Sequence, residues 1–181
     1  MKRRPRDIGT AAESATVKYL VANGFPHAER RSLRGALDAG DITGTPSVAW
    51  EVKGGDAARN ASDLTITRWM QELAVEMTNA NAKAGVLVVQ RAGVGPANAG
   101  RWWAWMPAFQ LVDLATNSDP DDLVTEQAFP VRMLLADAVT LLRAAGYGEP
   151  EARPVVAPYQ PTAATPDGIE DIAIPGLEAV K

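Results

Sequence analysis

The chain of 181 residues has no cysteine and only one histidine, His27. The lack of cysteine excludes disulfide bonds, thiolate catalysis and thiolate-bound zinc, and a single histidine cannot form a multi-histidine metal site. Any metal ion must therefore be held by carboxylate oxygens, which favour Mg²⁺, Mn²⁺ or Ca²⁺. We expect His27 itself to be an ordinary surface residue.

Long hydrophobic runs are also absent. The basic start, MKRRPRD, is not followed by the apolar segment that a secretory signal needs, and no stretch is apolar over the length of a membrane-spanning helix. With 46% hydrophobic and 22% charged residues, the composition is typical of a water-soluble globule. We therefore expect a cytoplasmic protein that makes no contact with membranes.

Positive charge is concentrated near the N-terminus, although the net charge is −4. Residues 1–60 carry ten Lys and Arg against seven Asp and Glu, whereas residues 148–181 carry two against six. Cationic side chains in the first third could bind phosphate groups, although a basic terminus can also serve only solubility. The arginines concerned are Arg3, Arg4, Arg6, Arg30, Arg31 and Arg34.

The first part of the chain shows a helix pattern and then strand patterns. Apolar residues recur at helical spacing over 10–23, and Gly24 is placed to end that helix. Residues 27–32 and 40–43 are predicted as short strands and residues 47–53 as a third. We expect these three strands to form a meander.

The next part continues the alternation of helix and strand. A longer helix is predicted from Ile66 to Ala84, with Ser62 as its N-cap. The run from Val86 to Val89 is apolar throughout, as in a strand covered on both faces, and should lie inside the sheet. A strand over 101–106 and a helix over 131–142 follow. These elements predict an α/β fold with a mixed sheet of about five strands flanked by helices.

The composition changes after residue 147. Residues 148–181 are rich in proline and acidic residues and show no sustained periodicity. We interpret residues 1–147 as one domain and residues 148–181 as a flexible, disordered acidic tail. Isoleucines in this tail could dock a protein partner, or the tail could be passive.

Two charged residues stand two apart on a strand that is otherwise apolar. Glu51 and Lys53 share one face of this strand, and Val52 points to the other. Asp41, ten residues before Glu51, would meet it across an antiparallel turn. Two carboxylates brought together repel each other, and a divalent cation commonly offsets that repulsion. A surface ion pair on an edge strand is the alternative explanation for Glu51 and Lys53.

Glu13 on the first helix, Asp41 after a glycine, and the Glu51-Val-Lys53 run together resemble the motif of the PD-(D/E)XK nuclease superfamily. Within it the chain is most similar to archaeal-type Holliday junction resolvases and their phage relatives, over about residues 7–106. The superfamily usually has proline before its metal-binding aspartate, whereas this chain has Gly40.

The resemblance implies a restriction-endonuclease-like core and a Mg²⁺-dependent endodeoxyribonuclease in which Mn²⁺ can substitute. The implied catalytic residues are Glu13, Asp41, Glu51 and Lys53. The ion would be held by Asp41, Glu51 and the Val52 carbonyl, with Glu13 contributing directly or through water. Thr10 and the six arginines named above would contact DNA. The implied substrate is branched double-stranded DNA, cut by a homodimer in the cytoplasm of a bacterium or a phage-infected host.

Two other functions fit the same residues. The chain could be a nuclease of the same chemistry that acts in repair, in restriction or on duplex ends. It could also be a DNA-binding module without catalysis, although the intact set of Asp41, Glu51 and Lys53 argues against that reading.

Some of these residues also have simple structural explanations. Thr10 and Glu13 match a capping box, in which Glu13 would reach back to the start of its helix. Asp38 is a rival to Asp41 as the metal-binding aspartate, but its offset of three residues would place it in the turn.

The tryptophans and the polar side of the long helix have similar explanations. Trp102, Trp103 and Trp105 could stack on unpaired bases, but we expect at least two of them to fill the core. We expect a solvated helix face to account for Gln71, Glu72 and Glu76.

Overall fold

The structure, a computed structural model, describes residues 5–32, 38–116 and 129–150. The chain divides into two units, Met1–Glu151 and Ala152–Lys181, and the described residues all lie in the first. Nearly all of the predicted tail, from residue 151 onward, lies outside them, so its boundary at residue 148 stays a prediction. None of the helices in the described ranges is long and apolar enough to cross a membrane.

The first half of the fold brings two helices and three strands close to their predicted positions. Its elements are α1 (Pro5–Ala22), β1 (Glu29–Arg30), β2 (Ile42–Thr43), β3 (Val48–Lys53), α2 (Gly55–Arg59) and α3 (Asp63–Ala80). Helix α3 begins at its predicted cap, because the Ser62 hydroxyl accepts a hydrogen bond from the Thr65 amide at 3.3 Å. Helix α1 begins five residues before Thr10. The capping-box explanation for Glu13 is therefore wrong, since Thr10 lies inside the helix.

The second half departs further from the prediction. Its elements are β4 (Ala84–Val89), the 3₁₀ helix η1 (Pro96–Arg101), β5 (Trp103–Pro107), α4 (Ala108–Thr116), β6 (Pro130–Leu134) and α5 (Leu135–Ala144). The helix predicted over 131–142 begins only at Leu135, because Val131 and Met133 pair with β5 as part of strand β6. Helices α2 and α4 were not predicted.

The strands form two sheets instead of one. A four-stranded mixed sheet has the order β3-β4-β5-β6, in which β3 and β4 are parallel and the other pairs are antiparallel. Strand β4 lies inside this sheet, as predicted. Strands β1 and β2 form a separate antiparallel pair, so the predicted meander is only partly correct. A single backbone hydrogen bond, from the Asp41 amide to the Trp50 carbonyl at 2.8 Å, joins the chain before β2 to β3.

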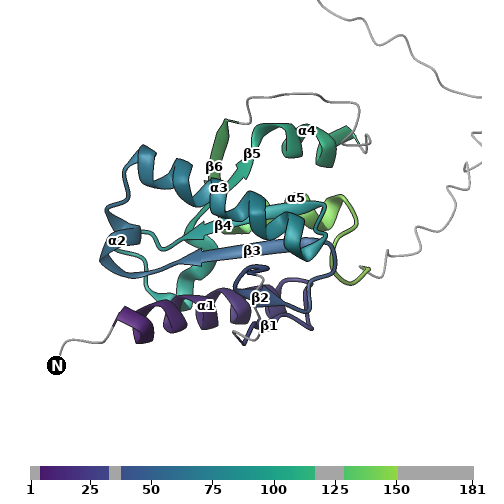
Figure 1. The fold of residues 1–181 in the computed structure, drawn as a ribbon. Coiled ribbons are helices and arrows are strands. Elements are labelled where there is room, and N and C mark those ends of the chain that lie inside the picture. The colour runs from purple at the N-terminus through teal and green to yellow at the C-terminus, as the bar shows by residue number, and fades with distance from the viewer. Residues whose placement is uncertain (1–4, 33–37, 117–128, 151–181) are drawn as a thin grey trace, which may run out of the picture. The chain divides into compact units, whose positions relative to one another are not determined.

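The four-stranded sheet is covered differently on its two faces. Val48, Trp50 and Val52 of β3 pack with α1 and α5 in the larger apolar core. Ala49 of the same strand belongs to a second cluster, built around Trp69 of α3. Figure 1 shows α3 lying across the front of β3 and β4, with α1 running beside β3. The face under α3 is the face that holds the charged residues of β3.

Candidate active site

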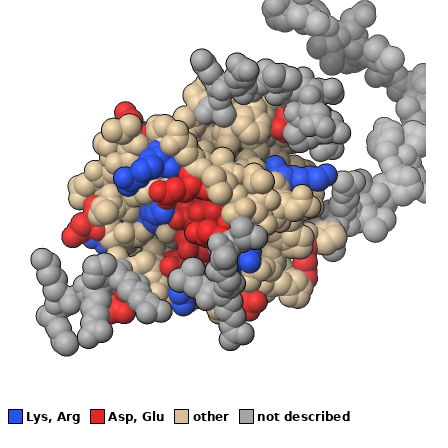
Figure 2. All heavy atoms as spheres, in the orientation of Figure 1, with Lys and Arg blue, Asp and Glu red and all other residues tan. Residues whose placement is uncertain are grey.

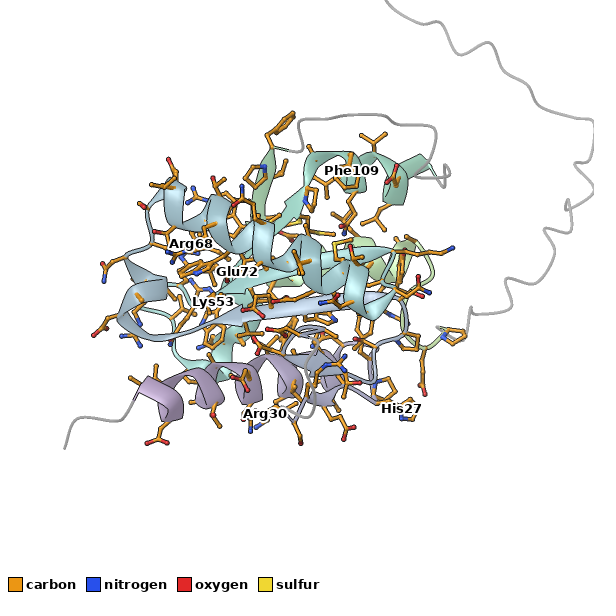
Figure 3. All side chains as sticks on the ribbon, viewed as in Figure 1. His27, Arg30, Lys53, Arg68, Glu72 and Phe109 are labelled. Atoms are coloured by element: carbon orange, nitrogen blue, oxygen red, sulfur yellow. The ribbon has the colours of Figure 1, made fainter. Side chains whose placement is uncertain are left out.

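Strand β3 places Glu51 and Lys53 on the face covered by α3, as their spacing predicted. The Glu51 side chain is only 7% exposed, and its carboxylate pairs with the ammonium group of Lys53. Helix α3 adds two further partners to that ammonium. Glu72 Oε2 lies 3.0 Å from Lys53 Nζ, and the Trp69 ring lies 5.6 Å from it. Figure 3 shows Lys53 and Glu72 close together where α3 crosses β3.

This pairing partly agrees with the alternative of a surface ion pair. Glu51 and Lys53 do pair, and β3 is the end strand of the four-stranded sheet. The pair is not on the surface, however, because Glu51 is buried and Lys53 is only partly exposed. A buried carboxylate must be compensated, since an unpaired buried charge is strongly unfavourable.

Asp41 reaches this site because Gly40 precedes it. Gly40 adopts a φ of +87°, and a Cβ atom at this position would lie 2.9 Å from the Trp50 carbonyl oxygen. Proline cannot take that φ value, so the proline usual in the superfamily would not fit here. The Asp41 amide donates to the same Trp50 carbonyl, and Asp41 Oδ2 accepts a hydrogen bond from the Val52 amide at 2.8 Å. The carboxylate is thereby fixed beside the end of β3.

Asp41 and Glu51 lie close enough to share a proton. Burial, followed by the negative charge of Glu51, raises the pKa of Asp41 to about 7. Burial also raises the pKa of Glu51 to about 7, although Lys53 acts in the opposite direction. The two groups therefore compete for too little positive charge, as the sequence predicted for a pair of adjacent carboxylates.

A third carboxylate, that of Glu76 of α3, completes the cluster. Its side chain is 4% exposed, contacts Glu51, and has one buried oxygen, Oε2, with no hydrogen-bond partner. Burial, together with the charges of Asp38 and Asp41, raises the pKa of Glu76 to about 7. The expectation of a solvated face is wrong for Glu76. The spacing carried the signal, since Glu76 follows Leu73 by three residues and Trp69 by seven, which places it on the buried stripe.

Lys53 is the cation at the centre of this cluster. Burial lowers its pKa, but the carboxylates of Glu51 and Glu72 outweigh burial and raise the pKa above its ordinary value. Lys53 is therefore charged at neutral pH, and it can stabilise negative charge but cannot act as a base. Figure 2 shows acidic side chains gathered in a patch beside α3, bordered by Lys and Arg side chains.

Glu13 lies next to the cluster but has its own partner. Its Oε2 accepts a hydrogen bond from Arg30 Nε at 2.7 Å, and the same guanidinium group lies 3.4 Å from the Thr10 hydroxyl. The negative charge of Glu13 contributes to the raised pKa of Asp41, which places the two carboxylates near each other. Three of the predicted residues, Thr10, Glu13 and Arg30, are thus brought together at the edge of the site.

The other predicted DNA contacts are less favourably placed. The Arg31 side chain lines a hollow of about 230 Å³ with Thr45 and Val48, and its Nε is buried without a hydrogen-bond partner. Residues 3, 4 and 34 lie outside the described residues, as does the side chain of residue 6. The predictions for Arg3, Arg4, Arg6 and Arg34 therefore stay predictions.

Asp38, the rival to Asp41, lies in the turn as expected. Its carbonyl accepts a hydrogen bond from Asn79 Nδ2 at 2.6 Å, and its carboxylate accepts one from the Gly40 amide at 3.3 Å. Its charge acts on Glu76, but neither contact brings it to Val52 or Glu51, whereas Asp41 interacts with both.

The tryptophans and the histidine agree with their simple explanations. Trp102 is fully buried, and Trp103 and Trp105 pack against the cluster under α3. His27 is exposed and lies 3.5 Å from Glu149.

The backbone of β3 offers one more oxygen ligand. The Trp50 carbonyl binds Asp41, and the Lys53 carbonyl binds the Gln90 amide beyond β4. Because backbone groups alternate along a strand, the Val52 carbonyl lies on the same edge as Trp50, toward Asp41. Among residues 5–32, 38–116 and 129–150, no group of three or more Asp, Glu or His side chains is placed so that it could hold a metal ion. Mg²⁺ commonly needs only one or two carboxylates, with water and substrate oxygens completing its shell.

Comparison with protein-family models, curated proteins and solved structures found no match to this chain.

Proposed function

We propose that this chain is a metal-dependent DNA endonuclease of the PD-(D/E)XK superfamily with a restriction-endonuclease-like core. One observation carries the proposal. Asp41, Glu51 and Glu76, from three separate segments, bring three carboxylates together beside one ammonium group, Lys53, and two of the three, Glu51 and Glu76, are buried while Asp41 is half-buried. A stable core has no need of such an arrangement, because an uncompensated buried charge lowers stability.

A divalent cation fits the chemistry of these donors. The negative charge exceeds what Lys53 can balance, since Lys53 is already shared between Glu51 and Glu72. Glu76 Oε2 is a buried oxygen without a partner, which suits water in the shell of an ion. Asp41, Glu51 and the Val52 carbonyl would hold Mg²⁺ or Mn²⁺, and Glu13 would contribute directly or through water.

The reaction we propose is hydrolysis of a phosphodiester bond. A divalent cation would supply an activated water and shield the charge of the phosphate. Lys53, which is charged and held by Trp69, would donate hydrogen bonds to the phosphate oxygens as negative charge develops in the transition state. Arg30 would keep Glu13 oriented toward the site, because its guanidinium group spans Glu13 and Thr10.

The proposed substrate is a branched double-stranded DNA such as a four-way junction. The support for this substrate is the similarity of the sequence motif to Holliday junction resolvases. A homodimer would suit it, because a two-fold pair of sites can match two symmetric scissile bonds. Action on duplex ends and binding without cleavage are the outcomes that the experiment must separate from this one.

The experiment measures cleavage of a synthetic four-way junction and of a linear duplex of the same sequence, with Mg²⁺ and with EDTA. Wild type should nick the junction only with Mg²⁺, and Glu51→Gln should lose at least about a hundredfold in rate. Glu29→Gln is the matched control, because Glu29 is an exposed residue of β1, and it should cleave like wild type.

The outcomes divide the alternatives. Preferential cleavage of the linear duplex would replace the junction with another DNA substrate but keep the chemistry. Equal activity of wild type and Glu51→Gln, or DNA binding without any Mg²⁺-dependent cleavage, would contradict the nuclease proposal.

A further inference from the structure

Two arginines stack on one tryptophan at the face of the sheet that carries Lys53. The guanidinium carbon of Arg91 lies 4.3 Å from the centre of the Trp103 ring, and that of Arg132 lies 4.6 Å from it. Arg132 also lies 5.5 Å from the centre of the Trp105 ring. We call Arg91, Trp103 and Arg132 the arginine–tryptophan stack.

The two arginines differ from other arginines of the fold in having no acidic partner. Arg30, Arg59 and Arg68 each pair with a carboxylate. Arg91 and Arg132 form neither an ion pair nor a hydrogen bond within the described part of the chain; their contacts are with the indole rings. Two full positive charges are thus left uncompensated in a protein whose net charge is −4.

Stacking prepares a guanidinium group to bind a phosphate. An aromatic ring contacts the flat face of the guanidinium and leaves its N–H donors, which lie in the plane, free to form a two-pronged contact. The ring also limits the freedom of a long side chain before any ligand arrives, so less entropy is lost on binding. A stacked arginine without a carboxylate partner is therefore suited to an anion with two oxygens.

The strand register relates the stack to Lys53. Lys53 pairs with Val89 of β4, and Val89 pairs with Trp103 of β5, so the three residues form one row across the sheet. Neighbouring strands are about 4.8 Å apart, which puts the Trp103 backbone about 10 Å from that of Lys53. Arg91 lies two residues after the end of β4, and Arg132 of β6 pairs with Trp105. Figure 3 shows Lys53 and Arg68 at the end of α3 that lies over this part of the sheet.

We infer that Arg91 and Arg132, held on Trp103, bind backbone phosphates of a DNA strand that also passes the acidic cluster. This inference rests on the proposed nuclease function, because it takes the same substrate and extends its contact across the sheet toward β5 and β6. A polynucleotide is the occupant that the charges favour, since its phosphates repeat at the short spacing that two neighbouring arginines and Lys53 require. The phosphate contacts expected from the sequence lie in the N-terminal third of the chain, and the tryptophans were considered only for stacking on bases, so a phosphate-binding surface at Arg91 and Arg132 is an addition to that set.

The test measures DNA binding without cleavage. Fluorescence anisotropy of a labelled four-way junction in EDTA is recorded at several salt concentrations for wild type, Arg91→Gln, Arg132→Gln and the double variant. Each lost phosphate contact should reduce the slope of log affinity against log salt by about 0.9, which amounts to about an eightfold loss of affinity at 0.1 M salt. Lys83→Gln is the matched control, because Lys83 is exposed and precedes β4, at the end opposite Arg91.

Lysine variants distinguish the contribution of the charge from that of the planar guanidinium group. They also provide a test if the glutamine variants do not fold. Arg91→Lys and Arg132→Lys keep the charge but lose the planar fork, so the salt slope should stay near that of wild type while affinity falls by a few fold. Inorganic phosphate, added against chloride at equal ionic strength, tests whether the surface takes a free anion instead. If phosphate displaced the DNA at concentrations far below those at which chloride displaces it, the assignment to a DNA strand would be overturned.

The inference and the proposed function can fail separately. Unchanged salt slopes in both glutamine variants, or an equal loss in Lys83→Gln, would overturn the phosphate-binding surface even if Mg²⁺-dependent cleavage were found. No binding of DNA by wild type would also overturn it. Reduced slopes in a protein that never cleaves would sustain the surface and contradict only the nuclease proposal.

Discussion

The two faces of the four-stranded sheet differ in what the same strands present. Toward α1 and α5, β3 contributes Val48, Trp50 and Val52, and all three are buried among apolar side chains. Toward α3, the alternate positions of the same strand end in Glu51 and Lys53. Because successive side chains point to opposite faces, one strand can stabilise the fold on one side and hold charged groups on the other. The charged face lowers the free energy of unfolding. The apolar face must be well packed to offset that loss.

Truncating the apolar face should have the largest effect. Trp50 is fully buried, packs edge-on against Phe25 and donates a hydrogen bond to the Thr45 hydroxyl at 3.2 Å. Trp50→Ala should lower the free energy of unfolding by about 3–5 kcal/mol, as measured by urea denaturation. Trp103→Ala, on the other face, should cost less because Trp103 is partly exposed. An equal or larger loss at Trp103 would contradict the contrast between the two faces.

The charged face should make the stability of the metal-free protein fall as pH rises. Asp41, Glu51 and Glu76 keep their protons to about pH 7 in the folded chain, against ordinary values of 3.8 for Asp and 4.5 for Glu. The folded state therefore binds more protons than the unfolded state between about pH 4 and pH 7, and its stability decreases across that interval. With allowance for partial exposure and coupling, the loss should be roughly 3 kcal/mol.

Denaturation in EDTA at pH 5 and pH 8 measures this loss. Saturating Mg²⁺ should restore part of it at pH 8, because an ion binds the deprotonated carboxylates. A metal-free protein that is more stable at pH 8 than at pH 5 would contradict the raised pKa values.

Gly40 lies against the Trp50 carbonyl, the group that holds the Asp41 backbone beside β3. A substitution at Gly40 therefore tests how Asp41 is positioned. Gly40→Ala places a methyl group 2.9 Å from that oxygen in addition to the strain of a positive φ, and should lower stability by about 2 kcal/mol. Gly93→Ala is the matched control, because Gly93 has a φ of +73° and no atom within 4 Å of an added Cβ. It should lose only about 1 kcal/mol. Equal losses would mean that Asp41 does not depend on the close approach of Gly40 to β3.

Substitution of Glu76 should have the smallest effect on the free energy of unfolding, and it should raise stability instead of lowering it. Glu76→Gln removes a buried charge that repels Asp41 and Glu51, so the metal-free protein should gain about 1 kcal/mol at pH 8. The rise in melting temperature on adding Mg²⁺ should become smaller, since an oxygen ligand for the ion's water is lost. Glu72→Gln, at an exposed position on the same helix, should change the free energy of unfolding by less than about 0.5 kcal/mol. Loss of stability in metal-free Glu76→Gln would assign Glu76 a structural role.

The sequence predicted the parts of the site that depend on local spacing. A period of two places Glu51 and Lys53 on one face, and the Gly40–Asp41 step before a short turn brings Asp41 back to them. Both expectations concern residues within thirteen positions of each other. Strand β4 was also predicted inside the sheet, because only a strand covered on both faces is apolar throughout.

The missed features depend on contacts between distant segments. The spacing of Val131, Leu134 and Leu135 suits a helix equally well, and only pairing with β5 makes Val131 part of a strand. Glu76 was assigned to the polar side of its helix, although its spacing from Trp69 and Leu73 places it on the buried stripe. Its partners, Asp41 and Glu51, precede it in the chain by 35 and 25 residues.

The parallel pairing of β3 with β4 determines when the site can assemble during folding. Val48 pairs with Ala84, 36 residues later in the chain, and α3 must form and cross over before the two strands align. Contacts of such long sequence separation close late, because a large loop must be ordered first. Glu51 and Glu76 come from the two elements that this crossover brings together, so a nascent or partly unfolded chain holds its acidic side chains apart.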